Sequence, residues 1–302
     1  MSIFNLGIYL GFSASFAYGN FLAPVVGWRA TLLAAGAPGL LSLGLFFVPD
    51  PRNQRNSKAI SVETDSSTSA INATDNTPKA NPDTPVAART WQELLSNPAF
   101  LLLCLAGGIR NSGALIWATN TQLFFQNTRH ASPADIGSYM SWIPAVAGSI
   151  GAVAGGYLAD RVVKRRGLNA RLLVMVLSNL MAAPLAAGAL WLPTPAAYLI
   201  LLPTNVVGEM WIGATLAVVT ELAVPELRTM AVAIFLFVIM NMGGNANLVL
   251  PWLEQSLSQQ HALLILYPGL YALSSVLFAI TWLVLRRASR RQRFGEKQPL
   301  LH

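Results

Sequence analysis

The sequence predicts an all-α integral membrane protein with about eight transmembrane helices. Of its 302 residues, 54% are hydrophobic and 11% are charged, whereas charged residues make up about 25% of a soluble domain. The apolar residues gather in runs of about 20, the length at which a helix crosses a bilayer. The basic residues lie at the ends of these runs and in the tail, so the net charge of +7 indicates contact with anionic lipid rather than with nucleic acid.

The apolar runs define the expected spans in chain order. They cover residues 3–26, 31–48, 98–124, 136–159, 172–192, 196–222, 230–253 and 263–285. Two of the spans are rich in glycine, which predicts faces on which neighbouring helices approach closely. These glycines are Gly7, Gly11 and Gly19 in the first span and Gly148, Gly151, Gly155 and Gly156 in the fourth.

The composition also divides the chain. Residues 1–49 hold the first two spans, and residues 93–286 hold the other six. Residues 50–92 are rich in Ser, Thr, Asn, Asp and Pro and nearly lack aromatic residues, so they cannot bury a core and are predicted to form a disordered cytoplasmic linker. Residues 287–302 are predicted to form a basic cytoplasmic tail.

Basic residues predict the orientation in the membrane. Basic clusters follow the fourth and the last span, and such clusters remain in the cytoplasm. The short turns on the other side carry only Arg29 and Arg129. We therefore expect a multi-pass protein with both termini in the cytoplasm.

The loop after the fourth span carries a short motif. A small residue at the helix end is followed by an acid and a basic cluster, which on one interpretation is a generic cytoplasmic loop. The pattern also resembles the loop signature of the major facilitator superfamily, G-x-x-x-D-R-x-x-K/R-K/R. The matching positions are Gly156, Asp160, Arg161, Lys164 and Arg165.

This resemblance implies a partial major facilitator fold. Members of the superfamily have two six-span halves joined by a cytoplasmic linker. On that plan residues 1–49 resemble the last two spans of the N-terminal half and residues 93–286 the complete C-terminal half, with nothing corresponding to the first four spans. Three explanations stay open: a truncated gene prediction, a splice form and a shortened protein.

Shorter segments resemble one family within the superfamily. Residues 112–118, the Gly208-Glu209 pair, residues 217–221 and the segment 225–231 around Arg228 are similar to the Spinster family of lysolipid and sphingolipid transporters. The resemblance covers most of the chain.

Two charges lie inside predicted spans. Arg110 and Glu209 are expected near the midplane, where an uncompensated charge costs at least about 2.5 to 3.5 kcal/mol, so the two should meet directly or through water or substrate. One interpretation is a buried ion pair that fixes helix packing. The other is a cavity in which Arg110 receives an anionic head group and Glu209 exchanges a proton. Asn205 and Trp117 share the faces of these residues and complete the predicted cavity lining.

Two further sets of residues have predicted roles at the cytoplasmic side. Glu221 and Arg228 flank the turn after the sixth span and are expected to form a conformational gate with the loop around Asp160. In the tail, Glu296, Leu300 and Leu301 match the acidic dileucine pattern that sorting adaptors read. The pattern favours an endosomal or lysosomal membrane, with the plasma membrane as the alternative.

The sequence predicts neither an enzyme nor a cofactor or metal site. Cys104 is the only cysteine, no His, Cys and Asp residues have metal-ligand spacing, and no glycine-rich phosphate loop precedes a helix. The resemblance implies a secondary active transporter that moves an anionic or zwitterionic amphiphile by alternating access, with protons as a further partner. Two alternatives stay open: a non-transporting partner or regulator of a full-length paralogue, and a facilitator of a small organic anion or sugar.

Overall fold

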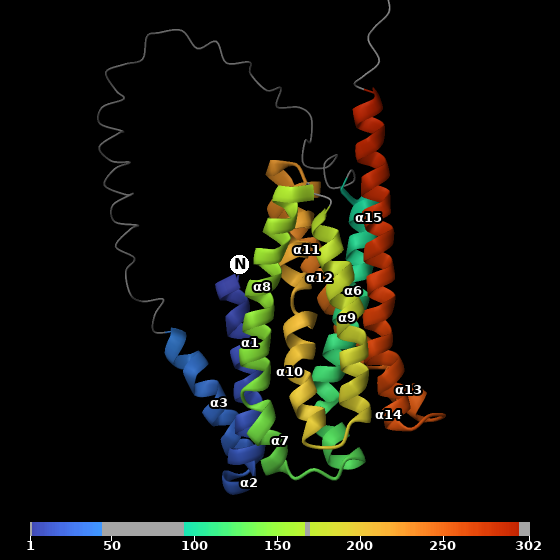
Figure 1. Ribbon diagram of the computed structural model, residues 1–302. Coiled ribbons are helices and arrows are strands. Elements are labelled where there is room, and N and C mark those ends of the chain that lie inside the picture. The colour runs from blue at the N-terminus through green and yellow to red at the C-terminus, as the bar shows by residue number, and fades with distance from the viewer. Residues whose placement is uncertain (1, 44–93, 167–169, 296–302) are drawn as a thin grey trace, which may run out of the picture. The chain divides into compact units, whose positions relative to one another are not determined.

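The computed structural model describes residues 2–43, 94–166 and 170–295, with side chains for residues 7–40, 94–164, 170–225 and 227–287 (Figure 1). The described residues are helical and contain no strand. Contacts divide the chain into two compact units, one of Met1–Phe21 with Ala87–His302 and one of Leu22–Val86. The linker and tail boundaries expected from the composition stay predictions.

Six helices among the described residues are long and apolar enough to cross a membrane. Each coincides with one of the last six predicted spans, which confirms the all-α membrane fold. They are Pro98–Thr128, Pro133–Lys164, Arg171–Trp191, Ala196–Leu222, Arg228–Glu254 and Gln259–Arg287. The first two predicted spans are helical as well: α1 (Ser2–Ala17), η1 (Tyr18–Leu22) and α2 (Ala23–Val26) make up the first, and α3 (Trp28–Leu43) the described part of the second.

Several spans consist of more than one helical segment. The third comprises α6 (Pro98–Leu123) and η3 (Phe124–Thr128), the fourth α7 (Pro133–Met140) and α8 (Ile143–Arg166), and the fifth α9 (Arg171–Trp191). The sixth comprises α10 (Ala196–Gly208) and α11 (Trp211–Leu222), followed by η5 (Pro225–Leu227). The seventh comprises α12 (Arg228–Ala246) and α13 (Val249–Glu254). The eighth comprises α14 (Gln259–Leu264), η6 (Ile265–Gly269) and α15 (Leu270–Gly295), which continues into the basic tail.

Local sequence explains where helices begin. The Asn97 side chain accepts a hydrogen bond from the Ala99 backbone N–H at 3.0 Å, and Pro98 occupies the first helical position of α6. Ser132 and Pro133 start α7 in the same way. A polar cap followed by proline satisfies one free N–H and removes the need for another, so both starts follow directly from the sequence.

The larger unit packs around α6, α8 and α9. Helix α6 contacts α12 and α15, α9 contacts α10 and α15, and α8 contacts α1 and α10. Figure 1 shows α1 beside α8 and the long α15 beside α6 and α9. In the second unit, α2 and α3 meet at Gly27, whose φ of +82° is a backbone conformation that favours glycine.

Glycines on α8 allow close contact with the sixth span. A Cβ atom at Gly151 would lie 2.3 Å from the Val206 carbonyl oxygen, and one at Gly155 would lie 2.3 Å from the Met210 carbonyl oxygen. The prediction of close packing is confirmed at these two glycines and at Gly148, which faces the Tyr9 ring. At Gly156 the contact comes from α11, because a Cβ atom on Gly213 would lie 4.0 Å from the Gly156 Cα atom. The prediction is wrong at Gly7, Gly11 and Gly19 in the first span, because a Cβ atom there would meet nothing within 4 Å among the described residues.

Candidate functional site

A cavity of about 340 Å³ lies inside the larger unit, between α1, α6, α8, the sixth span, α12 and α15. Most of its lining is apolar, with Ile8, Phe12, Leu115, Ile212 and Met240 as examples. All four residues that the sequence predicted as cavity lining are part of it: Arg110, Trp117, Asn205 and Glu209. Their roles in binding a substrate or a proton stay predictions.

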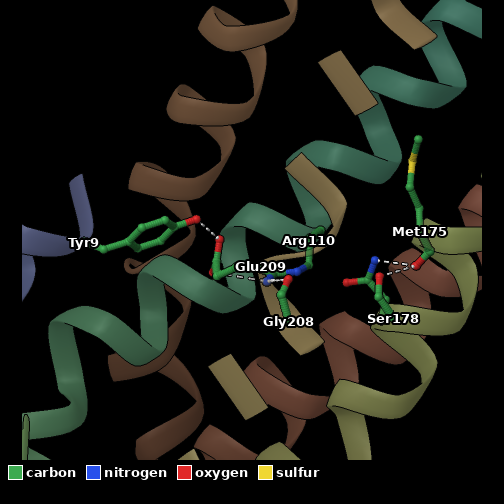
Figure 2. A network of polar contacts seen from close by, with 7 residues as sticks. Tyr9, Arg110, Met175, Ser178, Gly208 and Glu209 are labelled. Carbon is green, nitrogen blue, oxygen red and sulfur yellow. Dashed lines mark hydrogen bonds and ion pairs between the residues drawn. The ribbon is translucent and has the colours of Figure 1, made fainter. Parts of the chain in front are cut away.

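The structure brings Arg110 and Glu209 together. The Arg110 Nη2 atom lies 3.5 Å from the Glu209 Oε1 atom, and the two side chains are 1% and 22% exposed (Figure 2). A guanidinium group that is almost fully buried among apolar helices needs a neighbouring negative charge, because desolvation is costly. Glu209, which lies between α10 and α11, supplies that charge.

The sixth span is interrupted at Glu209. Helix α10 ends at Gly208, α11 begins at Trp211, and Glu209 adopts φ −90° and ψ 0° between them. The last carbonyls of a helix lack helical partners, and Nη2 of Arg110 donates a hydrogen bond to one of them, the Gly208 carbonyl oxygen (Figure 2). Arg110 therefore holds the broken span through its backbone as well as through its carboxylate.

Aromatic side chains complete the surroundings of the pair. The Tyr9 hydroxyl donates a hydrogen bond to the Glu209 Oε2 atom at 2.9 Å, so α1 and α6 hold the two oxygens of one carboxylate (Figure 2). The Arg110 guanidinium carbon lies 4.0 Å from the Tyr271 ring centroid and 5.2 Å from that of Trp211. Such cation–π contacts partly replace the hydration that burial removes.

Part of the guanidinium group has no protein partner. The hydrogen bonds from Arg110 to Gly208 and to Glu209 both use Nη2. The buried Nε atom has no hydrogen-bond partner among the described residues. A guanidinium group carries five N–H donors, so Arg110 retains donors for a further acceptor group.

Trp117 and Asn205 shape the cavity in different ways. Trp117 is 5% exposed and stacks on the Tyr267 ring, with centroids 4.9 Å apart and planes 1° from parallel. The Asn205 carbonyl oxygen accepts a hydrogen bond from the Glu209 backbone N–H at 2.9 Å, which closes the last turn of α10. Both residues therefore fix walls of the cavity.

A second charge cluster lies near the C-terminal end of α8. Arg171, the first residue of α9, forms ion pairs with Asp160 on α8, at 3.1 Å, and with Glu221 on α11. Sequence reasoning missed Arg171, because a basic residue at the start of a span also fits the positive-inside pattern. The predicted partner Arg228 is exposed at the start of α12, and no ion pair among the described side chains includes it.

The remaining residues predicted for the gate and the sorting signal do not lie together in one site among the described side chains. Arg161 contacts Tyr157 on its own helix at 3.3 Å, and Lys164 is exposed. The Arg165 side chain and the sorting-signal residues Glu296, Leu300 and Leu301 lie outside the part of the chain for which side chains are described.

Comparison with known proteins decides the family. Residues 1–246 match the sequence profile of the Major Facilitator Superfamily. The chain belongs to the Major Facilitator Superfamily. This membership confirms the prediction of a partial major facilitator fold, and it confirms that the chain comes from a family of transporters and not of enzymes.

Individual relatives are more distant. An MFS-type efflux pump of Mycolicibacterium smegmatis is 23% identical over 300 residues, which cover 96% of this facilitator chain and 64% of the pump. The chain thus spans less than two thirds of the length of that relative.

Two solved structures share the fold. Both are crystal structures of a bacterial homolog of the human lysosomal transporter Spinster in an inward-facing conformation, one unoccupied and one occupied. The TM-scores are 0.56 and 0.53, with 17% and 16% sequence identity. Each alignment covers 96% of this chain, and 68% and 67% of the solved chains. The resemblance to the Spinster family therefore predicted the fold correctly.

Proposed function

We propose that this facilitator chain carries the substrate cavity of a secondary active transporter for an anionic or zwitterionic amphiphile, such as a lysophospholipid or a sphingoid phosphate. The observation that carries the proposal is Arg110, a buried cation with unused donors in a mostly apolar cavity. Guanidinium groups bind phosphate well because their donors match two phosphate oxygens at once.

The cavity fits a molecule with a polar head and an apolar body. Its volume of about 340 Å³ lies near the lower limit of ligand pockets, about 300 to 1,000 Å³. It holds a head group and the first part of an acyl chain, while Phe12, Leu115 and Met240 provide apolar contacts.

Glu209 has a proposed role in exchange. Its carboxylate and an anionic head group would compete for the same guanidinium group, so binding of the head group releases Glu209 from Arg110. The released carboxylate takes up a proton, and Tyr9 holds it in position. Proton coupling of this kind is common for intramembrane acids.

The second cluster is proposed as the conformational gate. Arg171 joins α8, α9 and α11 through Asp160 and Glu221, so these helices separate at this end only when the ion pairs break. We include the loop residues Gly156, Arg161, Lys164 and Arg165 and the helix start at Arg228 in the same proposed gate.

The proposed location is an endosomal or lysosomal membrane with both termini in the cytoplasm. Support comes from the basic residues after the last span and from the dileucine pattern at Glu296, Leu300 and Leu301. The plasma membrane is the alternative. Sorting adaptors and membrane lipids are the proposed partners besides the substrate.

Thermal stabilisation by ligands tests the transport proposal. The midpoint of thermal unfolding of the purified chain is measured with lysophosphatidic acid, with a monoacylglycerol of the same acyl chain, and with inorganic phosphate. We expect the lysophosphatidic acid alone to raise the midpoint of unfolding, and Arg110→Ala to abolish the rise. The matched control is Asn245→Ala, since the Asn245 side chain is exposed and donates a hydrogen bond to the Asn241 carbonyl oxygen of its own helix. An equal rise with the uncharged lipid, or in the Arg110 variant, contradicts the proposal.

A further inference from the structure

Polar side chains join the end of α1 to the other helices. Asn20 in η1 and Gln122 in α6 form a reciprocal pair: Asn20 Nδ2 donates to Gln122 Oε1 at 3.1 Å, and Gln122 Nε2 donates to Asn20 Oδ1 at 2.7 Å. Asn20 is 5% exposed, whereas Gln122 is half-buried.

A second contact of α1 caps α8. The Ser13 hydroxyl accepts a hydrogen bond from the Ala145 backbone N–H at 2.9 Å, and Ser13 is 4% exposed. The first N–H groups of a helix have no helical partner, and Pro144 at the preceding position has no N–H at all. Ser13 therefore supplies from α1 the cap that α8 lacks in its own sequence.

Close packing accompanies these bonds. A Cβ atom at Gly137 on α7 would lie 2.8 Å from the Asn20 Cβ atom and 2.8 Å from the Phe21 ring. Near the other end of α1, a Cβ atom at Gly7 would meet nothing within 4 Å among the described residues. Helix α7 thus packs closely against the segment at Asn20 and Phe21.

These contacts lie at one end of the cavity. Its lining includes Phe16, Thr121, Met140 and Pro144. Gln122 directly follows Thr121 and Ala145 follows Pro144, while Asn20 donates a hydrogen bond to the Phe16 carbonyl oxygen at 2.9 Å. The Arg171 cluster is at the opposite end of α8, beyond Asp160.

We propose that Ser13, Asn20 and Gln122 form a latch that closes this end of the cavity and must open once in each transport cycle. The inference rests on the proposed transport function. The latch consists of neutral groups, so opening it requires water to replace hydrogen bonds but separates no charges. An interhelical hydrogen bond in a membrane changes such an equilibrium by about threefold on average. The latch is therefore weak enough to open during turnover.

Cysteine accessibility tests the latch without requiring transport. Cys104 is first replaced by alanine, which leaves a chain without cysteine. Thr121→Cys then reports on the cavity below the latch, and Ile239→Cys reports on a lining position of α12, since both residues are 1% exposed. The probe is a water-soluble maleimide added to the protein in lipid nanodiscs.

We expect Asn20→Ala and Ser13→Ala to raise the labelling rate at position 121 about three- to tenfold and to leave position 239 unchanged. The double variant Asn20→Gln with Gln122→Asn swaps the two amide side chains and should restore slow labelling at position 121. Ser15→Ala is the matched control, because Ser15 bonds the Phe12 carbonyl of its own helix. Unchanged labelling at position 121, or an equal rise at both positions, overturns the proposal. Labelling is independent of ligand, so a failure of the proposed function leaves this result interpretable.

Discussion

The two charge clusters of this facilitator chain differ in their surroundings. Arg110 and Glu209 are 1% and 22% exposed and meet in a cavity between helices. Arg171 is 14% exposed, but its partners Asp160 and Glu221 are 68% and 31% exposed at the end of the bundle. A buried charge depends on its single partner, whereas water and salt compensate an exposed one. Substitution of Arg110 or Glu209 should therefore lower stability strongly, and the loss should not depend on salt. Substitution in the Arg171 cluster should lower stability little, and that loss should shrink as the salt concentration rises.

The largest effect is expected from leaving Arg110 without its partner. Glu209→Leu should lower the free energy of unfolding by about 3 to 5 kcal/mol, because an uncompensated buried charge remains. The double variant Arg110→Met with Glu209→Leu should recover most of that loss. Thermal unfolding in detergent measures both, and a double variant that is less stable than Glu209→Leu contradicts the buried-pair account.

The next effect concerns the contact that positions the break at Glu209. Gly155→Ala places a methyl group 2.3 Å from the Met210 carbonyl oxygen, and overpacking of this kind costs about 1 to 3 kcal/mol. Gly156→Ala is the matched control, since a Cβ atom at Gly156 would meet nothing within 4 Å among the residues that the structure describes. Equal midpoints of thermal unfolding for the two variants would show that α8 does not hold the break.

A smaller effect should follow from Tyr9→Phe. The change removes one hydrogen bond to the Glu209 carboxylate, and bonds to charged groups contribute about 1.5 to 3 kcal/mol. Because the Glu209 side chain is 22% exposed, water can partly replace the lost hydrogen bond, so the loss of stability should lie near the lower end of this range. The loss is measured by comparing the midpoint of thermal unfolding of Tyr9→Phe with that of the control variant Tyr18→Phe. A midpoint equal to that of the control shows that the hydroxyl does not stabilise the pair.

The smallest effect is expected at the second cluster. Arg171→Ala should cost about 0 to 1 kcal/mol, because exposed ion pairs contribute little, and the cost should fall between about 0.1 and 1 M salt as screening shortens the range of the charges. Glu209→Leu should show no such salt dependence. A loss at Arg171 that persists in high salt would remove the distinction between the two clusters.

Much of this arrangement could be predicted from the sequence. The spans follow from hydropathy, and Arg110 and Glu209 are conspicuous because ionised residues inside spans are rare. The spacing of Gly151 and Gly155 on one helix face indicated a close contact. Each of these signals is local, or rests on one strong energetic rule.

Other residues could not be found in this way. Tyr9 and Tyr271 are ordinary residues for apolar helices, and only the fold brings them to Arg110 and Glu209. The break after Gly208 has no proline at its centre to indicate it. Arg171 is one of many basic residues near span ends, so its choice of Asp160 and Glu221 depends on how α8, α9 and α11 pack.

The most direct test of the account is the affinity of the purified chain for lysophosphatidic acid in three forms: wild type, Arg110→Ala and Glu209→Gln. If the head group displaces Glu209 from Arg110, Glu209→Gln removes a competitor and should bind at least as tightly as wild type. Arg110→Ala should bind at least about tenfold more weakly, the loss of one charge-assisted interaction. Equal affinity of wild type and Arg110→Ala would contradict the proposal that Arg110 receives the substrate.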